Sequence, residues 1–215
     1  MDSSIQIIEK PEWVSWDDIK QCLVDAHSIN RDKGINMTNY QWPADKIKEF
    51  LGEKGVMLVA LDGTRIVGTA AIAEKTEKKW YAQGRCAYMC FAGVIPEYSS
   101  RGIYKALINK REKIAEESGY HNLIFDTHCH NTRIQEIARK NRYRYVRYFC
   151  AKSGDHFSVV MAKWLRECPF SDRFIKRQFL ISKILTKIQF KNNGKERGRI
   201  ISIISKKLRK RLLGY

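Results

Sequence analysis

The chain has 215 residues, of which 44% are hydrophobic, and this length and composition suit one domain with a core of ordinary size plus an appendage. No stretch approaches the roughly 20 consecutive apolar residues that a membrane-spanning helix needs. The first residues, MDSSIQIIEKPEW, lack the basic and apolar regions of a secretion signal, so the sequence predicts a cytoplasmic protein.

The net charge of +17 is unevenly distributed. Residues 166–215 hold 15 Lys and Arg against 3 Asp and Glu, a net of +12, which leaves 25 minus 20, or +5, for residues 1–165. We therefore expect a globular domain over 1–165 and a basic tail over 166–215. Such charge attracts anions of many kinds. Because no zinc-finger, RNP or helix-turn-helix signature is present, a specific nucleic-acid partner is not expected.

The six cysteines are scattered without a CxxC pair, which favours reduced thiols in the cytosol over a disulfide frame or a structural zinc site. Along the chain, SIQIIEK alternates like a strand, and SWDDIKQCLVDAHSIN has helical spacing with Ser15 as N-cap and Asp18 completing a capping box. PADKIKEFLGEKG predicts a second helix, which begins near Pro43 and ends at a glycine.

The middle of the chain changes to the period of strands. VMLVALDGTRIVGTAAIAE predicts a hairpin turning at Asp62-Gly63, and RCAYMCFAGVI predicts a central strand that Pro96 ends. GIYKALINKREKIAEESG predicts a helix ending at Gly119. HNLIFDTHC then reads as a strand, NTRIQEIARKN as a helix capped by Asn131, and RYRYVRYFCA with FSVVMAKWL as a final strand pair.

The loop between the central strand and the following helix has features that favour binding of an anion. A strand that turns directly into a helix leaves several backbone N–H groups aimed at one small volume. Gly102 permits close approach, Ser99 and Ser100 add hydroxyls, and Arg101 adds a permanent charge. An ordinary strand-to-helix loop is the alternative, since one glycine is a weak signal by itself.

The stretch VIPEYSSRGIYKALI resembles the acetyl-coenzyme A loop of the GNAT acyltransferases, Q/R-x-x-G-x-G/A after a V-x-P-x-Y turn. NTRIQEIARKNRYRYV resembles that family's second marker helix, and the order of elements over residues 5–165 is similar too. The departures are Ser99 for Gln or Arg, Tyr104 for a small residue, Ala138 for a tyrosine, and Arg142 for a glycine. The resemblance implies an α+β fold of three layers, with a mixed central sheet of about seven strands whose fourth and fifth strands splay apart between flanking helices.

The resemblance also implies a site. The pantetheine arm of acetyl-CoA would bond the backbone of Ala92, Gly93 and Val94, with Asn131 on the other side. The pyrophosphate would lie on the loop and helix start, at Ser99, Ser100, Arg101, Gly102, Ile103 and Tyr104. An amine attacks the thioester directly, a backbone N–H near Val94 stabilises the developing negative charge, and no metal is required.

His128 and Tyr88 are the expected catalytic residues. An ammonium acceptor must lose a proton, and a histidine can take it near neutral pH, so His128 at the end of the splayed strand is the preferred base over His130. Tyr88 and Tyr104 are candidates to protonate the leaving thiolate. A hydrogen-bonded loop histidine and a packed tyrosine are the alternatives. Metal binding by residues 128–130 is not expected, because alternation along an extended chain points Cys129 away.

The basic tail reads as two amphipathic helical stretches. In residues 173–190, one helical face carries Phe174, Ile181, Ile184, Leu185 and Ile188. Residues 198–215 show the same amphipathic pattern. Such helices commonly lie on anionic membranes, so we expect peripheral attachment to the inner face of a membrane. Packing of these faces on the domain, or on a second subunit in a homodimer, is the alternative.

The favoured function is acetyl transfer from acetyl-CoA to the amine of a small molecule. The tail suggests an amino sugar of surface-polysaccharide synthesis, on whose ring Tyr40 and Trp42 could stack. An acidic carrier protein as acyl donor stays open. The alternative of a different class is a catalytically impaired GNAT-like module that binds a partner or a membrane through its tail.

Overall fold

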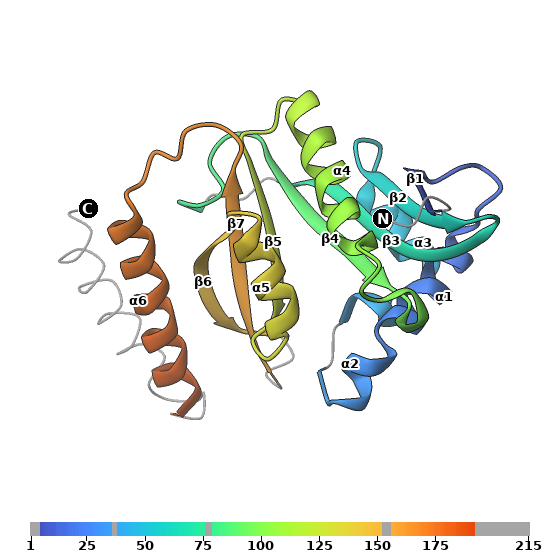
Figure 1. Ribbon diagram of the computed structural model, residues 1–215. Helices are drawn as coiled ribbons and strands as arrows, with labels where there is room; N and C mark the ends of the chain where they lie inside the picture. Colours follow the sequence, from blue (N-terminus) through green and yellow to red (C-terminus); the bar gives the residue numbers. More distant parts are fainter. Residues whose placement is uncertain (1–4, 36–37, 76–78, 152–155, 192–215) are drawn as a thin grey trace.

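The computed structural model describes residues 5–35, 38–75, 79–151 and 156–191 (Figure 1). The second predicted tail helix, over 198–215, lies outside these residues. One sheet of seven strands runs through the molecule in the order β1-β2-β3-β4-β5-β7-β6. The strands are β1 Ile5–Glu9, β2 Val56–Asp62, β3 Arg65–Lys75, β4 Cys86–Val94, β5 Asn122–His128, β6 Arg144–Cys150 and β7 Phe157–Trp164. The helices are α1 Trp16–Ala26, α2 Ser28–Asp32, α3 Ala44–Leu51, α4 Ile103–Glu117, α5 Thr132–Lys140 and α6 Asp172–Lys191, with short 3-10 turns at Thr38–Gln41 and Pro96–Tyr98.

The sheet is mixed, and its one parallel pair is β4 with β5. These two strands pair only at their starts, where Cys86–Tyr88 lie against Asn122–Ile124. Beyond Tyr88 each strand keeps its other neighbour, β3 or β7, but the two diverge (Figure 1). The seven-stranded mixed sheet with a splayed fourth and fifth strand, predicted from the resemblance, is confirmed.

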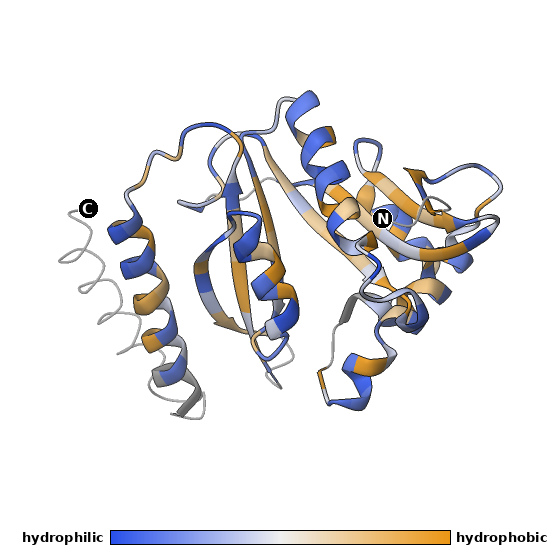
Figure 2. Cartoon of the chain, viewed as in Figure 1, coloured by the Kyte–Doolittle hydropathy of each residue, from blue (hydrophilic) through white to orange (hydrophobic). Residues whose placement is uncertain are grey.

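Helices cover both faces of the sheet. On one face α1 and α3 enclose a core with β2, β3 and β4 that includes Leu23, Ile47 and Val59. On the other face α4 packs through Ile103 and Leu107 on the first strands, and α5 lies over β5 and β7. Figure 2 shows the strands largely apolar, whereas α4 is mostly hydrophilic on the surface that it turns away from them. The split between β4 and β5 therefore lies between two layers of helices.

Local signals in the sequence explain where several elements begin and end. Ser15 caps α1, and its backbone N–H bonds the Asp18 carboxylate in return, as the capping-box pattern predicts. The hairpin between β2 and β3 turns at Gly63, which has φ +58°. Pro96 follows β4 and opens the 3-10 turn. The loop that precedes α4 is thereby fixed at its start.

Two helix predictions need correction. The first predicted helix breaks after Ala26, and a separate short helix, α2, begins at Ser28. Asn131 precedes α5 as expected, but its side chain does not cap the helix. It donates instead to the Thr127 hydroxyl at 3.1 Å, because Asn131 is buried beside the end of β5.

The tail begins with α6, which packs along the edge strand β6 (Figure 1). Ile175 and Phe179 contact the apolar side chains of the domain, and two hydroxyls of α6 bond the backbone of Tyr148. Tyr148 N–H donates to Ser182 Oγ at 2.8 Å, and Thr186 Oγ1 donates to the Tyr148 carbonyl at 3.1 Å. The helix thus satisfies backbone groups that an edge strand would otherwise expose.

The face of α6 that packs coincides only in part with the predicted apolar stripe, of which Phe174 contacts Trp80 and Phe170 and Ile184 is exposed. Its inward residues are Ile175, Gln178, Phe179, Ser182 and Thr186, whereas Leu180 and Ile184 are 56% and 48% exposed. Hydrogen bonding to β6 explains why this face of α6 packs inward, because its polar residues face the edge of the strand. Across the described residues, none of the helices combines the length and the apolar character needed to cross a bilayer.

Candidate active site

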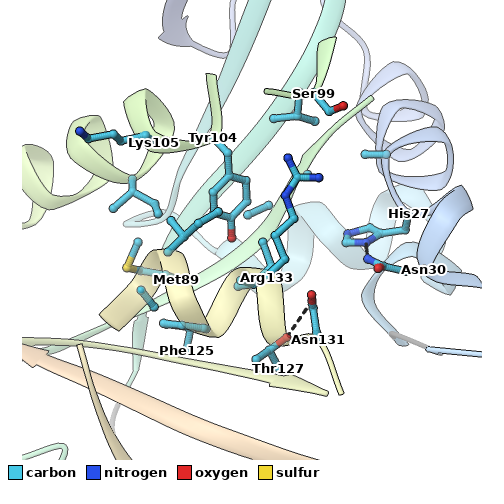
Figure 3. A pocket seen from close by; sticks show the side chains of 18 of the residues that line it. His27, Asn30, Met89, Ser99, Tyr104, Lys105, Phe125, Thr127, Asn131 and Arg133 are labelled. Carbon is cyan, nitrogen blue, oxygen red and sulfur yellow. Dashed lines mark hydrogen bonds between the residues drawn. The ribbon is translucent and has the colours of Figure 1, made fainter. Parts of the chain in front are cut away.

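A cavity of about 590 Å³ fills the split between β4 and β5. Its walls come from α2, from β4, from the loop and first turns of α4, from the end of β5, and from α5 (Figure 3). A single opening through the sheet therefore connects the α4 and α5 face with the α1 and α2 face. Such a passage can hold a long ligand on one side and a second reactant on the other.

A bulge in β4 shapes the cavity wall. The pairing with β3 shifts between Thr69 and Ala71, and Phe91 takes φ +47°, a left-handed conformation that is rare for a bulky residue. Thr69 Oγ1 donates to the Phe91 carbonyl at 3.0 Å and stabilises the distortion. Ala92, Gly93 and Val94 follow the bulge and line the cavity, where the sequence placed the contacts to the pantetheine arm.

The loop before α4, called the cradle below, has the geometry of an anion-binding site at the other end of the cavity. Gly102 precedes the helix with φ +80°, and Ser100 also takes a left-handed φ of +68°. The first N–H groups of a helix have no intrahelical acceptors, and the helix dipole adds positive charge at this point. Ser99, Ser100, Gly102, Ile103 and Tyr104 all line the cavity, as predicted for the pyrophosphate site.

Tyr98 anchors this loop to the rest of the domain. Its hydroxyl donates to Asp62 Oδ2 at 2.6 Å, which ties the loop to the β2–β3 hairpin. Acceptance by the carboxylate raises the pKa of the Tyr98 hydroxyl, mainly through the hydrogen bond itself. The cradle is therefore positioned by a contact between segments 36 residues apart.

The cation of the cradle differs from the predicted one. Arg101 lies over the Tyr98 ring, 4.5 Å from its centre, and its side chain is not part of the cavity wall. Arg133 of α5 lines the cavity instead, with Nη2 at 3.5 Å from Ser100 Oγ, and Lys105 lines it from α4 (Figure 3). No spacing in the sequence pairs residue 133 with residue 100, so only the fold reveals Arg133.

On the face covered by α1 and α3, Tyr88 of β4 donates a hydrogen bond to the carboxylate of Asp126 on β5. Both residues line the cavity beside the point where the strands part. Lys75 lies over the Tyr88 ring, 4.1 Å from its centre. The pair places an acid-base group and a phenol together in the passage through the sheet.

His128, the predicted base, lies outside the cavity wall. It is 7% exposed, its ring stacks on His156 with centroids 5.0 Å apart, and its Nδ1 accepts from the backbone N–H of His130 at 3.1 Å. Asp126 shares its side of the strand, two residues earlier, and does line the cavity. Alternation along the strand would have placed Asp126 on the same side as His128, but the position at the end of the strand and the ordinary pKa of a histidine favour His128 in the sequence.

The expectation that Cys129 points away from its neighbours is wrong. The potential ligand atoms of His128, Cys129 and His130 all lie within 4.8 Å of one another. Alternation fails here because β5 ends at His128 and the chain turns toward α5.

His27 joins α2 to the backbone of β4, a link that the sequence did not reveal. Its Nδ1 lies 3.3 Å from Asn30 Nδ2, and its ring also hydrogen bonds to the Ala92 carbonyl (Figure 3). Burial lowers the pKa of His27 to about 4, although the bond to Ala92 acts in the opposite direction. The neutral ring, accepting at Nδ1 and donating at Nε2, holds the rim of α2 against the bulged strand.

The aromatic residues proposed to stack on a sugar pack against other side chains of the protein instead. Tyr40 is 5% exposed and stacks on His27, with centroids 5.6 Å apart. Trp42 contacts Phe50 and Phe91 edge to face. Their packing supports the wall of the acceptor side, and neither lines the cavity.

The acetyltransferase (GNAT) family model matches residues 16–142, more than half of the chain. A search of curated protein sequences returns no match. Among solved structures, an acetyltransferase from Streptococcus agalactiae is 15% identical with a TM-score of 0.58, over 76% of this chain and 99% of that one. NAA60 from Arabidopsis thaliana in complex with acetyl-CoA is 18% identical with a TM-score of 0.56, over 75% of this chain and 98% of that one.

The Escherichia coli ribosomal-protein-S18-alanine N-acetyltransferase is also similar, with 12% identity and a TM-score of 0.57 over 76% of this chain and 96% of that one. A split sheet with a loop of this geometry at the head of the next helix fits a coenzyme A-dependent acyltransferase. With the matching family model, the chain belongs to the GNAT family of N-acetyltransferases, whose members use acetyl-CoA as donor. The open cradle, the exposed β4 backbone and Arg133 fit that donor.

Proposed function

We propose that the protein transfers an acetyl group from acetyl-CoA to the amine of a small molecule, with Asp126 as the group that receives the proton of the acceptor. The observation that carries this proposal is the contact of Tyr88 with Asp126 inside the passage between the two layers. When bound, acetyl-CoA supplies the thioester that the amine attacks.

The residues of this chain have distinct parts in that reaction. The N–H groups around Gly102 and the guanidinium of Arg133 hold the diphosphate, which fixes the donor along β4. The Asp126 carboxylate attracts an ammonium group and accepts its proton, which leaves a neutral amine able to attack. Tyr88 stands beside it as the donor for the departing thiolate, and a backbone N–H near Val94 stabilises charge on the carbonyl oxygen.

The acceptor side of the cavity is lined by apolar residues, such as Ile29 and Ile35, and by several polar ones. His27, Asn30 and Lys33 of the α2 region face it together with Asp126 and His130. Hydroxyl-rich molecules with one amine suit such a wall, because side chains of these kinds supply both donors and acceptors. An amino sugar is therefore the first class of acceptor to test, although Tyr40 and Trp42 are not the residues that would stack on it.

A screen of thiol release from acetyl-CoA over amines tests the proposal. We expect turnover with at least one amino sugar or other small amine, and its loss in Asp126→Asn. Binding of acetyl-CoA without turnover on any amine, including peptide N-termini, would favour the catalytically impaired module. Release from an acyl carrier protein and not from acetyl-CoA would identify the carrier as donor.

We also propose that α6 attaches the protein to an anionic membrane surface. Leu180 and Ile184 lie one turn apart on its outward side and are 56% and 48% exposed. Arg177 and Lys187 are exposed on the same helix. Apolar side chains flanked by basic ones favour the interface of an anionic bilayer, where each cation adds about 1 kcal/mol.

Flotation with vesicles of anionic and of neutral lipid tests this attachment. We expect recovery with the anionic vesicles only, and a marked decrease in the double variant Leu180→Gln, Ile184→Gln. This variant leaves the contacts of α6 with β6 in place, which removal of the whole tail would not. Equal recovery of the two proteins would contradict the proposal, and a change from dimer to monomer in the variant would identify a homodimer interface instead.

A further inference from the structure

A buried arginine lies at one end of the cavity. The transfer of an acetyl group, as proposed above, gives this arginine no role. Arg111 of α4 is 2% exposed and lines the cavity. Its Nε lies 3.4 Å from the Leu107 carbonyl, and its side chain hydrogen bonds to that of Tyr104. Among the described residues, no carboxylate forms an ion pair with it.

Such a cation needs an explanation. Removing a charge from water is unfavourable unless a counter-ion and hydrogen bonds replace the water. A lysine or histidine could lose its proton, but a guanidinium stays charged in proteins. The nearest acidic neighbour in sequence, Glu112, is engaged with Lys163, whose Nζ lies 2.6 Å from Glu112 Oε2. Arg111 therefore presents an uncompensated positive charge to the cavity.

The position of Arg111 along the cavity indicates which part of a donor it would meet. Tyr104, Ile108 and Arg111 line the wall on successive turns of α4, which begins at the cradle for the diphosphate. Arg111 follows Gly102 by nine positions, or about 13 Å along the helix axis. Arg111 thus lies far from the diphosphate.

Arg111 shares the cavity wall with Met89 and Cys90 of β4, which places it near the apex of the split. Arg111 lowers the pKa of the Cys90 thiol, against the larger effect of burial, and it acts on the hydroxyl of Tyr143 as well. Tyr143 in turn donates to Met89 Sδ at 2.9 Å. Met89 and Cys90 directly follow the last residue of β4 that pairs with β5. A donor lying along β4 with its diphosphate at the cradle would direct its acyl end toward this apex.

We propose that Arg111 binds the terminal carboxylate of an acyl group, so that the protein accepts dicarboxylic acyl thioesters of coenzyme A, such as succinyl-CoA. The proposal rests on the donor site proposed above. In the transfer, an amide bond forms between the acceptor nitrogen and the acyl carbon, and the carbon–sulfur bond breaks. The proton lost by the amine ends on the thiol of coenzyme A, and the far carboxylate remains ionised against Arg111.

Matched pairs of donors test the proposal on the unmodified full-length protein. Succinyl-CoA and butyryl-CoA differ by a carboxylate in place of a methyl group, and so do malonyl-CoA and propionyl-CoA. Calorimetry should show tighter binding of the acidic member in at least one pair, by about tenfold or more, as expected for a hydrogen-bonded charge pair. Equal affinities within both pairs would overturn the proposal.

Variants at position 111 provide the second measurement. Arg111→Met keeps the length of the side chain without its charge, so the affinity ratio of succinyl-CoA to butyryl-CoA should fall close to one, and Arg111→Lys should retain part of the preference. A ratio within one protein cancels a general loss of folded molecules. A preference that survives in Arg111→Met would overturn the assignment to Arg111. If this variant does not fold, the ratios of the unmodified protein decide, and failure of every coenzyme A thioester to bind overturns the donor site together with this proposal.

Discussion

The hydroxyl of Tyr88 donates to the carboxylate of Asp126 across the point where β4 and β5 begin to separate. The two residues come from strands that are 38 positions apart at this contact, and they meet because Tyr88 lies opposite Ile124 in the last paired position. The pair therefore lies at the apex of the split, on the face covered by α1 and α3.

Asp126→Asn should lower kcat/KM for acetyl transfer by about 10²–10⁴-fold, the usual contribution of a positioned acid or base. Tyr88→Phe should have a smaller effect, because the carboxylate stays in place. Steady-state kinetics measures both, with Glu117→Gln at the exposed end of α4 as the matched control. A larger loss in His128→Ala than in Asp126→Asn would instead identify His128 as the base.

Gly102→Ala should weaken acetyl-CoA binding by about tenfold or more, since a Cβ there projects into the cradle and a residue with φ +80° is strained. Gly119→Ala is the control, because Gly119 has φ +74° at the opposite end of α4 and its Cβ would meet only Arg85, at 3.7 Å. Both variants should lose similar stability in urea titrations. Similar losses of affinity by calorimetry would show that strain, and not the cradle, is responsible.

His27 predicts a dependence of stability on pH. Its pKa of about 4 in the folded protein lies below the ordinary value of about 6.5, so the unfolded chain binds more protons between these values. The stabilisation is full above pH 6.5 and is lost as the pH falls toward 4, by up to about 3 kcal/mol. Urea unfolding at several pH values should show a shallower slope for His27→Gln than for the unmodified protein. Parallel curves would assign the acid sensitivity to other groups.

Arg142→Gly should stabilise the protein. Arg142 follows α5 with φ +67°, at the position where the family pattern has glycine. Relief of a left-handed conformation gains about 1–2 kcal/mol, and the greater freedom of glycine in the unfolded chain offsets about half of it. The midpoint of thermal unfolding should rise by a few degrees, whereas Arg139→Gly within α5 should lower it. A lower midpoint for Arg142→Gly would mean that the arginine side chain contributes contacts that outweigh its strain.

The double variant Ser182→Ala, Thr186→Val should lose about 1–3 kcal/mol of unfolding free energy, because the N–H and carbonyl of Tyr148 lose their partners on α6. Exposure of the β6 edge should also promote aggregation. Chemical denaturation and light scattering measure the two effects, with the exposed Lys176→Ala as control. Unchanged stability would show that water replaces these hydroxyls at no penalty.

The sequence alone determined most of the elements and the place of the loop that forms the cradle. Several residues fix a local conformation through their own chemistry: Ser15 with Asp18, Gly63, Pro96 and Gly102. The caps and turns that they form can therefore be predicted without knowledge of the fold. The resemblance carried by residues 94–108 then predicted the split sheet and the residues along β4. These inferences depend on contacts within a few positions of the chain.

The tertiary structure decided the composition of the site. Asp126 meets Tyr88, and Arg133 meets Ser100, only because β4 and β5 lie side by side and α5 faces the loop before α4. The same fold removes His128 and the side chain of Arg101 from the cavity wall. The uncompensated charge of Arg111 is likewise invisible in the sequence, where it is one of 40 basic residues, because burial depends on the packing of distant segments.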